Sequence, residues 1–443
     1  MKAMKALLQP KAKIRGGAHV PHFKETAEGQ TVRMPAPSTV LLPMRQHIGA
    51  FCAPTVKVGE TVKMGQVIGD SENFVSVPIH APISGKVKSI TPFLISRGQT
   101  VDAILIENDG EEAHFEDLAP PSLNNRDDFL KAVRQSGLVG IGGAGFPTHV
   151  KLAFKEEVDT LVINAAECEP YITSDYREMM ENHAHVLQGI LRVMEHVSIP
   201  NCVIGIEKNK PEAIKLLVKE IEAQGIQDRV QVVELPAHYP HGAEKQLVYI
   251  CTGRIVPVGA LPSAVGAVVL NVSSISILNY YFDTGIPLVR KRVTVAGKAI
   301  KTPQNVFAPI GTSIEEIAEF CGGYGETPEK IIMGGPMMGV AQFDAKAPII
   351  KQTNALLFMS QAETFAPGES PCIRCGRCVD ACPMGLMPTY IERYANLGDG
   401  AMLKKLSVSA CMECGSCAFT CPAKRPLVQY LKQGKEIERG VGK

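Results

Sequence analysis

The chain has 443 residues, too many for one hydrophobic core, and typical domains of about 100–200 residues predict three or four of them. Its 46 basic and 45 acidic residues give a net charge of +1 with no long block of one sign, which argues against nucleic acid as the main partner because phosphate binding needs a concentrated basic surface. Thirteen cysteines and no visible secretion signal predict a cytoplasmic protein that binds metal rather than one held by disulfides.

The first organised segment, residues 30 to about 105, predicts short strands separated by turns. Its V-x-x-G-x-x-V steps, starting at Val56, and the later APISGKV resemble the barrel-sandwich hybrid fold of lipoyl and biotinyl carriers. Such carriers hold their cofactor on a lysine at a hairpin tip, whereas the matching tip here, residues 71–75 (SENFV), has no lysine. The sequence therefore favours a scaffold or docking module over a swinging-arm carrier.

From residue 122 the pattern changes to alternating helices and strands. Asn125 is the expected N-cap of a helix that stops at Gly137, and a glycine-rich stretch follows. Strands are expected at TLVINAAE, CVIGIE and VQVVEL, with a long helix after the first and a helix opened by Pro211 after the second. This alternation predicts a mostly parallel, doubly wound sheet.

An uncharged run covers residues 255–282 and exceeds the roughly 20 residues that cross a bilayer. Prolines, glycines and asparagines interrupt it, so we expect a buried part of an α/β core, with a transmembrane helix as the alternative. Beyond it, VTVAGKAI and NVFAPI predict two strands. GTSIEEIAEFCGG predicts a short helix, in which Thr312 and Glu315 have capping-box spacing. These elements fit a small β-grasp module.

The last segment contains two near copies of C-x2-C-x2-C-x3-C-P, starting at Cys372 and Cys411. In this motif three thiolates hold one cubane cluster and the fourth ligates the cluster of the other copy. Zinc is the alternative, but zinc sites usually use paired C-x2-C hooks set further apart. The motif therefore predicts two [4Fe–4S] clusters, the first held by Cys372, Cys375, Cys378 and Cys421, and the second by Cys411, Cys414, Cys417 and Cys382.

The residues between the two copies predict helix, with Thr389 and Glu392 in capping-box spacing. Because small two-cluster ferredoxins tend to have strands there, we expect the α-helical ferredoxin arrangement. The remaining cysteines are scattered singly, and we expect them to be small buried hydrophobic residues. They are Cys52, Cys168, Cys202, Cys251 and Cys321.

The stretch GIGGAGFPTHVK matches the dinucleotide fingerprint G-x-G-x-x-G at Gly140, Gly142 and Gly145. A Rossmann loop must leave a strand and open a helix, whereas a predicted helix precedes this stretch and Pro147 follows it. Its glycines still allow backbone N–H groups to approach a phosphate or a planar ring, with a tight packing turn as the alternative. Since NADH gives up two electrons and each cluster takes one, a flavin between them is expected.

Three stretches, GIGGAGFPTHVK, NAAECEP and YPHGAEKQL, resemble the flavin and NADH site of the flavin subunit of respiratory complex I. With GGAHVPHFK near the N-terminus, the carrier-like segment, the β-grasp module and the twin cysteine motifs, the chain is similar from end to end to the C-subunit family of Rnf electron transport complexes. The resemblance departs from complex I at Ala166 and Ala243, where that family has acidic residues.

The resemblance implies two sets of ligand contacts. FMN is expected at Gly140, Gly142, Gly143, Gly145, Lys151, Asn164 and Asn271, and NADH at Phe146, Glu167, Glu169 and Glu244. It also implies a multidomain α/β protein with four parts. They are an N-terminal arm and barrel-sandwich hybrid domain at residues 1–120, a Rossmann-like FMN and NADH domain at 121–290, an SLBB-like β-grasp domain at 291–350 and a helical ferredoxin domain with two [4Fe–4S] clusters at 360–435.

The implied function is that of a peripheral subunit on the cytoplasmic face of the cell membrane. It would pass electrons between NADH, FMN and two [4Fe–4S] clusters in a ferredoxin:NAD oxidoreductase complex that translocates ions, with membrane subunits as partners and ferredoxin as an indirect one. Two alternatives remain. One is a soluble flavin and iron–sulfur cobalamin reductase, against which residues 1–105 argue because such relatives generally lack them. The other is an electron-carrying binding module without a catalytic flavin.

Overall fold

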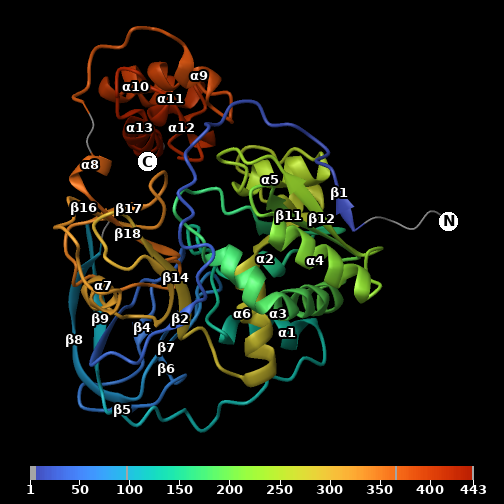
Figure 1. Ribbon diagram of the computed structural model, residues 1–443, viewed down its shortest axis with the longest axis vertical. Helices are drawn as coiled ribbons and strands as arrows, with labels where there is room; N and C mark the ends of the chain where they lie inside the picture. Colours follow the sequence, from blue (N-terminus) through green and yellow to red (C-terminus); the bar gives the residue numbers. More distant parts are fainter. Residues whose placement is uncertain (1–5, 96–97, 365–366, 442–443) are drawn as a thin grey trace.

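The computed structural model describes residues 6–95, 98–364 and 367–441 (Figure 1). The described strands form four sheets, and a helical unit follows them in the chain. One sheet has five strands in the order β1-β12-β11-β10-β13, and a second has six in the order β17-β16-β18-β14-β15-β2. The two smaller sheets have the orders β3-β9-β8-β5 and β4-β6-β7.

The two smaller sheets form the N-terminal hybrid unit, and their strands pair antiparallel. The strands are β3 (Thr39–Pro43), β4 (Ala53–Pro54), β5 (Thr61–Val62), β6 (Val67–Asp70), β7 (Ile79–His80), β8 (Gly85–Ile95) and β9 (Gln99–Asn108). The tip at residues 71–75 lies between β6 and β7. It packs against the neighbouring α/β unit, where Arg134 donates to the Ser71 carbonyl at 2.6 Å and the His149 ring donates to the Phe74 carbonyl at 2.9 Å.

The α/β unit is built on the parallel five-stranded sheet, which confirms the predicted doubly wound pattern. Its strands are β1 (Leu7–Leu8), β10 (Thr160–Ala165), β11 (Asn201–Glu207), β12 (Val230–Leu235) and β13 (Ala267–Asn271). Its helices are α1 (Arg126–Gln135), α2 (Thr148–Leu152), α3 (Ser174–His196), α4 (Pro211–Ala223), α5 (Glu244–Thr252), α6 (Val272–Thr284) and the 3-10 turn η1 (Pro262–Val265).

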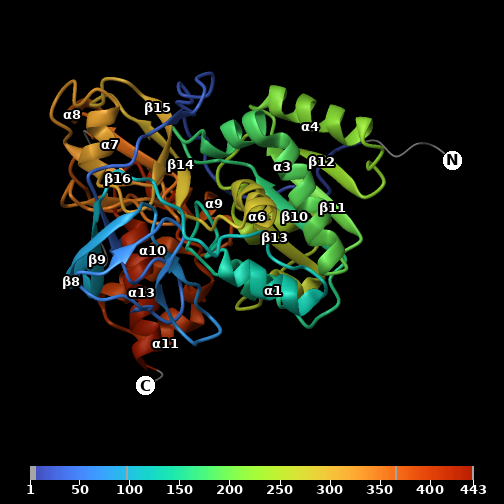
Figure 2. The same cartoon turned by 90° about the horizontal axis from the view of Figure 1, so that it is seen from below.

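Alternate residues of β10 face the two sides of this sheet. Leu161 and Ile163 belong to one buried cluster with residues of α1, α3, α4 and α6, whereas Val162 belongs to another cluster with residues of α5. Figure 2 shows α3 and α6 beside the strands of this sheet. The uncharged run supplies η1, β13 and most of α6, and from β13 onward it is largely buried in the α/β core, as expected. The start of the run differs from the expectation, because Ile255, Val258 and Leu261 are exposed. Among the described residues, no helix is both long and apolar enough to cross a membrane.

The six-stranded sheet gathers two separate stretches of chain, one strand from residues 32–33 and five from residues 290–359. Its strands are β2 (Val32–Arg33), β14 (Arg290–Ala296), β15 (Gln304–Pro309), β16 (Lys330–Met333), β17 (Val340–Gln342) and β18 (Ala355–Met359), with helix α7 (Ile314–Phe320). The predicted capping box is shifted by one residue. Ser313 caps α7 and exchanges hydrogen bonds with Glu316, because the Thr312 hydroxyl is buried and donates instead to the Pro309 carbonyl at 2.8 Å.

The cysteine unit is helical, and its described residues contain no strand. Its elements are α9 (Arg377–Asp380), α10 (Pro388–Asn396), α11 (Gly400–Lys405), η2 (Val408–Ala410), α12 (Ser416–Phe419) and α13 (Leu427–Val441), and α8 (Gln361–Thr364) precedes them. The second predicted capping box is wrong. Pro388 occupies the first turn of α10, so Thr389 lies inside the helix, and Glu392 pairs with Arg425 instead.

An N-terminal arm, residues 6–36, connects these units (Figure 1). It contributes β1 to the parallel sheet and β2 to the six-stranded sheet. Between these strands the Gly17 N–H donates to the Ala381 carbonyl of the cysteine unit at 2.9 Å. The arm therefore contacts three of the four units before the hybrid unit begins.

Candidate functional site

The glycine stretch forms a loop between α1 and the short helix α2. Gly142 and Gly145 have φ values of +71° and +72°, which L side chains rarely adopt. The Gly140 N–H donates to the Phe146 carbonyl at 2.9 Å, and the Gly142 N–H donates to the Gln352 carbonyl at 3.3 Å. As expected from the sequence, a helix and not a strand precedes the loop, so it is no Rossmann turn.

One face of this loop is open. Gly142, Gly143 and Ala144 are exposed, and apart from Gly143 and its two chain neighbours no atom of the described residues lies within 4 Å of the position that a Gly143 Cβ would occupy. The N–H groups of Gly143 and Ala144 have no hydrogen-bond partner within the described residues. Free backbone donors beside open space suit a planar or anionic ligand such as a flavin phosphate.

Asn164 and Asn271 lie side by side at the carboxyl ends of β10 and β13, paired in register. Asn164 donates to the Gly242 carbonyl at 2.8 Å. Asn271 caps α6 by accepting from the Ser274 N–H at 3.0 Å, and its amide donates to Asp175 at 2.8 Å. Ligands of parallel sheets bind at this edge, and the contact of both asparagines with FMN stays a prediction.

Lys151 and Glu244 form an ion pair across the same region. Lys151 comes from α2, and its ammonium also donates to the Val269 carbonyl in β13 at 3.2 Å. Glu244 lies in the first turn of α5. Lys151, which is expected at FMN, therefore contacts Glu244, which is expected at NADH. The contact lies next to β13, the strand that ends at Asn271.

The Glu167 side chain points into the protein and bonds to the start of α3. Its carboxylate accepts hydrogen bonds from the N–H groups of Asp175 and Tyr176, at 2.6 and 3.2 Å, at the start of α3. Burial raises the pKa of Glu167 to about 7, although the nearby Lys24 acts in the opposite direction. The side chain stabilises a helix N-terminus in this structure, and its contact with NADH stays a prediction.

Glu169 is also engaged by the protein. Its carboxylate accepts from the Met337 N–H at 3.0 Å, and it fills the space where a Gly335 side chain would lie. Burial raises the pKa of Glu169 to about 7, against hydrogen bonds that lower it. The loop at residues 334–339 belongs to the six-stranded sheet, so Glu169 ties that unit to the α/β unit, and its contact with NADH also stays a prediction.

Two lysines that the sequence did not single out hold the loop after β10. Lys24 of the arm donates to the carbonyls of Glu167, Glu169 and Ile172 at 3.0, 2.8 and 2.5 Å. Lys210 donates to the Ala166 carbonyl at 2.6 Å. Burial lowers the pKa of Lys24 to about 8. The signal available in the sequence was Lys24 itself, the last residue of GGAHVPHFK.

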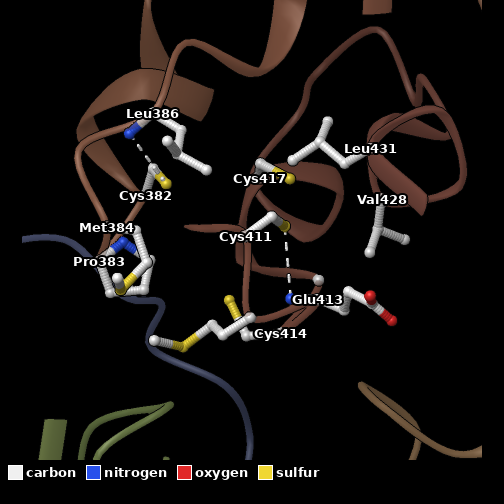
Figure 3. A pocket seen from close by; sticks show the side chains of 12 residues that line it. Cys382, Pro383, Met384, Leu386, Cys411, Glu413, Cys414, Cys417, Val428 and Leu431 are labelled. Carbon is white, nitrogen blue, oxygen red and sulfur yellow. Dashed lines mark hydrogen bonds between the residues drawn. The ribbon is translucent and has the colours of Figure 1, made fainter. Parts of the chain in front are cut away.

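The second predicted cysteine set lines one small hollow (Figure 3). Cys382 reaches it from one motif, and Cys411, Cys414 and Cys417 reach it from the other. Burial raises the pKa of Cys411 to about 11 and that of Cys417 to about 12, and neighbouring thiols add to both shifts. Cys414 and Cys417 are buried, and Cys382 and Cys411 are half-buried. Four soft donors from two chain segments are the ligand set of a cubane cluster, so the residues fit the group.

The first predicted set is more open. Cys378 is buried and packs in one small cluster with the half-buried Cys421, whereas Cys372 and Cys375 are exposed on the loop before α9. That loop is held near Cys421 by the Ser370 N–H, which donates to the Ala423 carbonyl at 3.0 Å. Among the described residues, no three His, Cys, Asp or Glu side chains converge as they would on a single metal ion.

Four of the five scattered cysteines are buried, as expected. Cys52, Cys202, Cys251 and Cys321 are buried, and Cys168 is half-buried. Burial raises the pKa of Cys251 to about 12 and that of Cys321 to about 11, which keeps these thiols protonated. They pack as small apolar side chains.

Three curated relatives cover most of this chain. The C subunit of a proton-translocating ferredoxin:NAD(+) oxidoreductase complex of Clostridium ljungdahlii is 43% identical over 440 residues, which are 97% of this chain and 94% of the relative. A Na(+)-translocating counterpart of Acetobacterium woodii is 42% identical (86% and 87%), and the C subunit of an ion-translocating oxidoreductase complex of Rhodobacter capsulatus is 40% identical (96% and 83%). The chain belongs to the Rnf C-subunit family.

Models of four domains match successive parts of this Rnf C-subunit family member. They are the RnfC barrel-sandwich hybrid domain at residues 12–111, the Nuo51 FMN-binding domain at 133–279, the SLBB domain at 292–341 and the 4Fe-4S dicluster domain at 359–425. They confirm the predicted fold class, and with it FMN and two [4Fe–4S] clusters as cofactors. A chain of an NAD+-reducing [NiFe]-hydrogenase superposes with a TM-score of 0.49 at 17% identity, over 71% of this chain and 63% of that chain.

Proposed function

We propose that this chain exchanges electrons between NAD(H) and the other subunits of a membrane-bound ferredoxin:NAD oxidoreductase complex, which couples the reaction to ion translocation. The observation that carries the proposal is the direct contact between the glycine-loop unit and the four-cysteine hollow. Gln246 of α5 donates to the Pro383 carbonyl at 3.1 Å, and Pro383 lines that hollow. Membership of the Rnf C-subunit family supports the same reaction.

The open face of the glycine loop is the proposed FMN cradle. The free N–H groups of Gly143 and Ala144 donate to the ligand. Asn164 and Asn271, at the ends of β10 and β13, form another wall of the cradle. Lys151 supplies a positive charge beside the cradle, since its side chain is a quarter exposed while it pairs with Glu244. When bound, FMN supplies the exchange between two-electron hydride transfer and single-electron transfer.

NADH is proposed to lie over this cradle. Phe146, at the end of the loop, is half-buried and offers an aromatic face, and Glu244 lies in the first turn of α5 with a partly exposed carboxylate. Such a carboxylate can accept hydrogen bonds from ribose hydroxyls. Glu167 and Glu169 complete the proposed set on the strength of the resemblance, with their loop held in place by Lys24 and Lys210.

The two cysteine sets are the proposed cluster ligands. Cys382, Cys411, Cys414 and Cys417 hold one cluster in the hollow, and Cys372, Cys375, Cys378 and Cys421 hold the other. When bound, the clusters carry single electrons. The crossed pattern is supported by Cys382 of the first motif, which joins three cysteines of the second at one hollow.

The proposed setting is the cytoplasmic face of the cell membrane, with the membrane subunits of the complex as partners and ferredoxin reached through them. The relatives from Clostridium ljungdahlii and Acetobacterium woodii, both named as C subunits of translocating complexes, support this setting. We propose the four domains with the bounds predicted from the sequence, with β18 and the arm strand β2 added to the β-grasp unit.

Anaerobic purification followed by an absorbance spectrum and by flavin, iron and sulfide analysis tests the proposal. We expect bound FMN, eight irons per chain from two four-iron clusters, and bleaching of the flavin band when NADH is added. Clusters without flavin, or a flavin that NADH does not bleach, would contradict the proposal. Recovery of the chain with membrane subunits in a pull-down separates it from a soluble cobalamin reductase, which would be recovered alone.

A further inference from the structure

A buried joint connects the α/β unit to the four-cysteine hollow, and Tyr239 lies at its centre. The Tyr239 side chain is 1% exposed, and its hydroxyl donates to the backbone carbonyl of Cys414 at 2.7 Å. Its backbone exchanges two hydrogen bonds with Ala18 of the arm, at 2.8 and 3.2 Å. Tyr239 is therefore fixed on one side by the arm and reaches the cysteine motif on the other.

The arm and the six-stranded sheet also pack closely against the cysteine motifs at this joint. A Cβ at Gly16 would lie 2.8 Å from the backbone of Cys382, so the arm approaches the cysteine motif as closely as glycine allows. From the six-stranded sheet, the Met337 carbonyl lies 3.0 Å from the position of a Gly415 Cβ. The cysteine hollow thus borders the other units on its Cys414 side.

Glu169 places a carboxyl group in this joint. One of its oxygens lies 3.5 Å from the Tyr239 hydroxyl, and the other accepts from the Met337 N–H at 3.0 Å. The Tyr239 hydroxyl lies closer to the Cys414 carbonyl, at 2.7 Å, than to the Glu169 carboxylate, at 3.5 Å, so the hydroxyl hydrogen points to the carbonyl. Tyr239 therefore presents the positive end of its O–H dipole to a backbone oxygen of a proposed cluster ligand.

We propose that Tyr239 is a positioning residue that fixes the Cys414 loop on the α/β unit and raises the reduction potential of the cluster bound there. The inference rests on the proposed function, in which Cys382, Cys411, Cys414 and Cys417 hold one [4Fe–4S] cluster. Reduction adds negative charge, and the carbonyl oxygen of Cys414 disfavours that charge. The O–H dipole offsets the carbonyl dipole, and in a buried joint such dipoles are weakly screened.

The test needs a chain with a single cluster. Cys375→Ser should remove the cluster of the open set and leave the one in the hollow. In this background Tyr239→Phe keeps the aromatic ring and removes only the hydroxyl. We expect the midpoint potential of the remaining cluster, measured by redox titration with electron paramagnetic resonance, to fall while iron content stays the same. Tyr171→Phe is the matched control, because its hydroxyl donates to Glu363 and not to the cysteine motif.

A potential that stays the same or rises in Tyr239→Phe overturns the proposal. If that variant does not retain its cluster, Glu169→Gln provides the second test. At alkaline pH this substitution removes a negative charge beside the hydroxyl and should raise the potential, whereas an unchanged or lower potential overturns the proposal. Two clusters, or none, in the Cys375→Ser chain would overturn the cysteine assignment and this inference with it. A single cluster that does not respond to Tyr239→Phe overturns this inference alone.

Discussion

The glycine loop allows the contact with FMN to be separated from the stability of the fold. At Gly143 a side chain meets open space in the protein alone, and the backbone lies outside the left-handed region. Gly143→Val should therefore change the free energy of unfolding by no more than about 0.5 kcal/mol, as surface substitutions do. If FMN occupies that space, the added methyl groups overlap it at a cost of about 1–3 kcal/mol.

This cost corresponds to a loss of roughly 5- to 150-fold in FMN affinity. Fluorescence quenching of FMN titrated with flavin-free protein measures the affinity, and urea unfolding of the same samples measures the stability. Gly29→Val is the matched control, since Gly29 is an exposed glycine that also meets no atom within 4 Å. Unchanged FMN affinity in Gly143→Val, with unchanged stability, would refute the assignment of the loop as the cradle.

The matching variant Gly142→Val distinguishes backbone strain from ligand overlap. Gly142 has a φ of +71°, and a Cβ there would lie 2.8 Å from the Asn354 side chain. A β-branched residue in this conformation costs about 1–2 kcal/mol of stability, so this variant should lose both FMN affinity and stability. Cluster absorbance should stay unchanged, because the loop is remote from the cysteine motifs in the chain; its loss together with FMN would mean that the loop is structural.

Three further predictions concern the other units. Cys375→Ser should lower the iron content and leave bleaching of the flavin by NADH intact; loss of bleaching would contradict the proposed roles. Arg292 is buried between Glu178 and Glu181, so Arg292→Leu should cost about 3–5 kcal/mol in urea unfolding, whereas the exposed Lys215→Ala should cost under about 1 kcal/mol. Burial lowers the pKa of Lys351 to about 7, so the folded chain releases this proton before the unfolded chain does. The free energy of unfolding should then rise with pH from about 7 toward 10.5, less steeply in Lys351→Met, and an equal slope in both proteins would contradict this assignment.

Local patterns predicted the elements of the α/β unit well. Asn125 caps α1 because its side chain accepts from the Asp128 N–H, and Pro211 opens α4 where its missing N–H costs nothing. The apolar TLVINA becomes β10, buried on both faces between helices. These features depend on neighbours a few residues away, which the sequence displays directly.

The sequence misplaced the cap of α7 because two neighbouring residues fit the same capping pattern. Thr312 and Ser313 both precede an acidic residue by three positions, and tertiary packing buries the first and leaves the second to cap α7. Lys24 was missed as a structural residue because its carbonyl partners lie far along the chain in the loop after β10. Glu167 and Glu169 lie where the motif places them, but only the structure reveals that their carboxylates bond to α3 and to the loop at 334–339.

The contacts of the arm also determine the order in which parts of the molecule can fold during synthesis. The residues of the arm leave the ribosome well before Ala381 and Val306, yet Gly17 bonds to Ala381 and Val32 pairs with Val306. Contacts between such distant parts of a chain form slowly, because a long loop must close before they are gained. The arm therefore completes its contacts only after the cysteine unit has emerged, so the joint over the cysteine hollow forms late relative to the folding of the separate units.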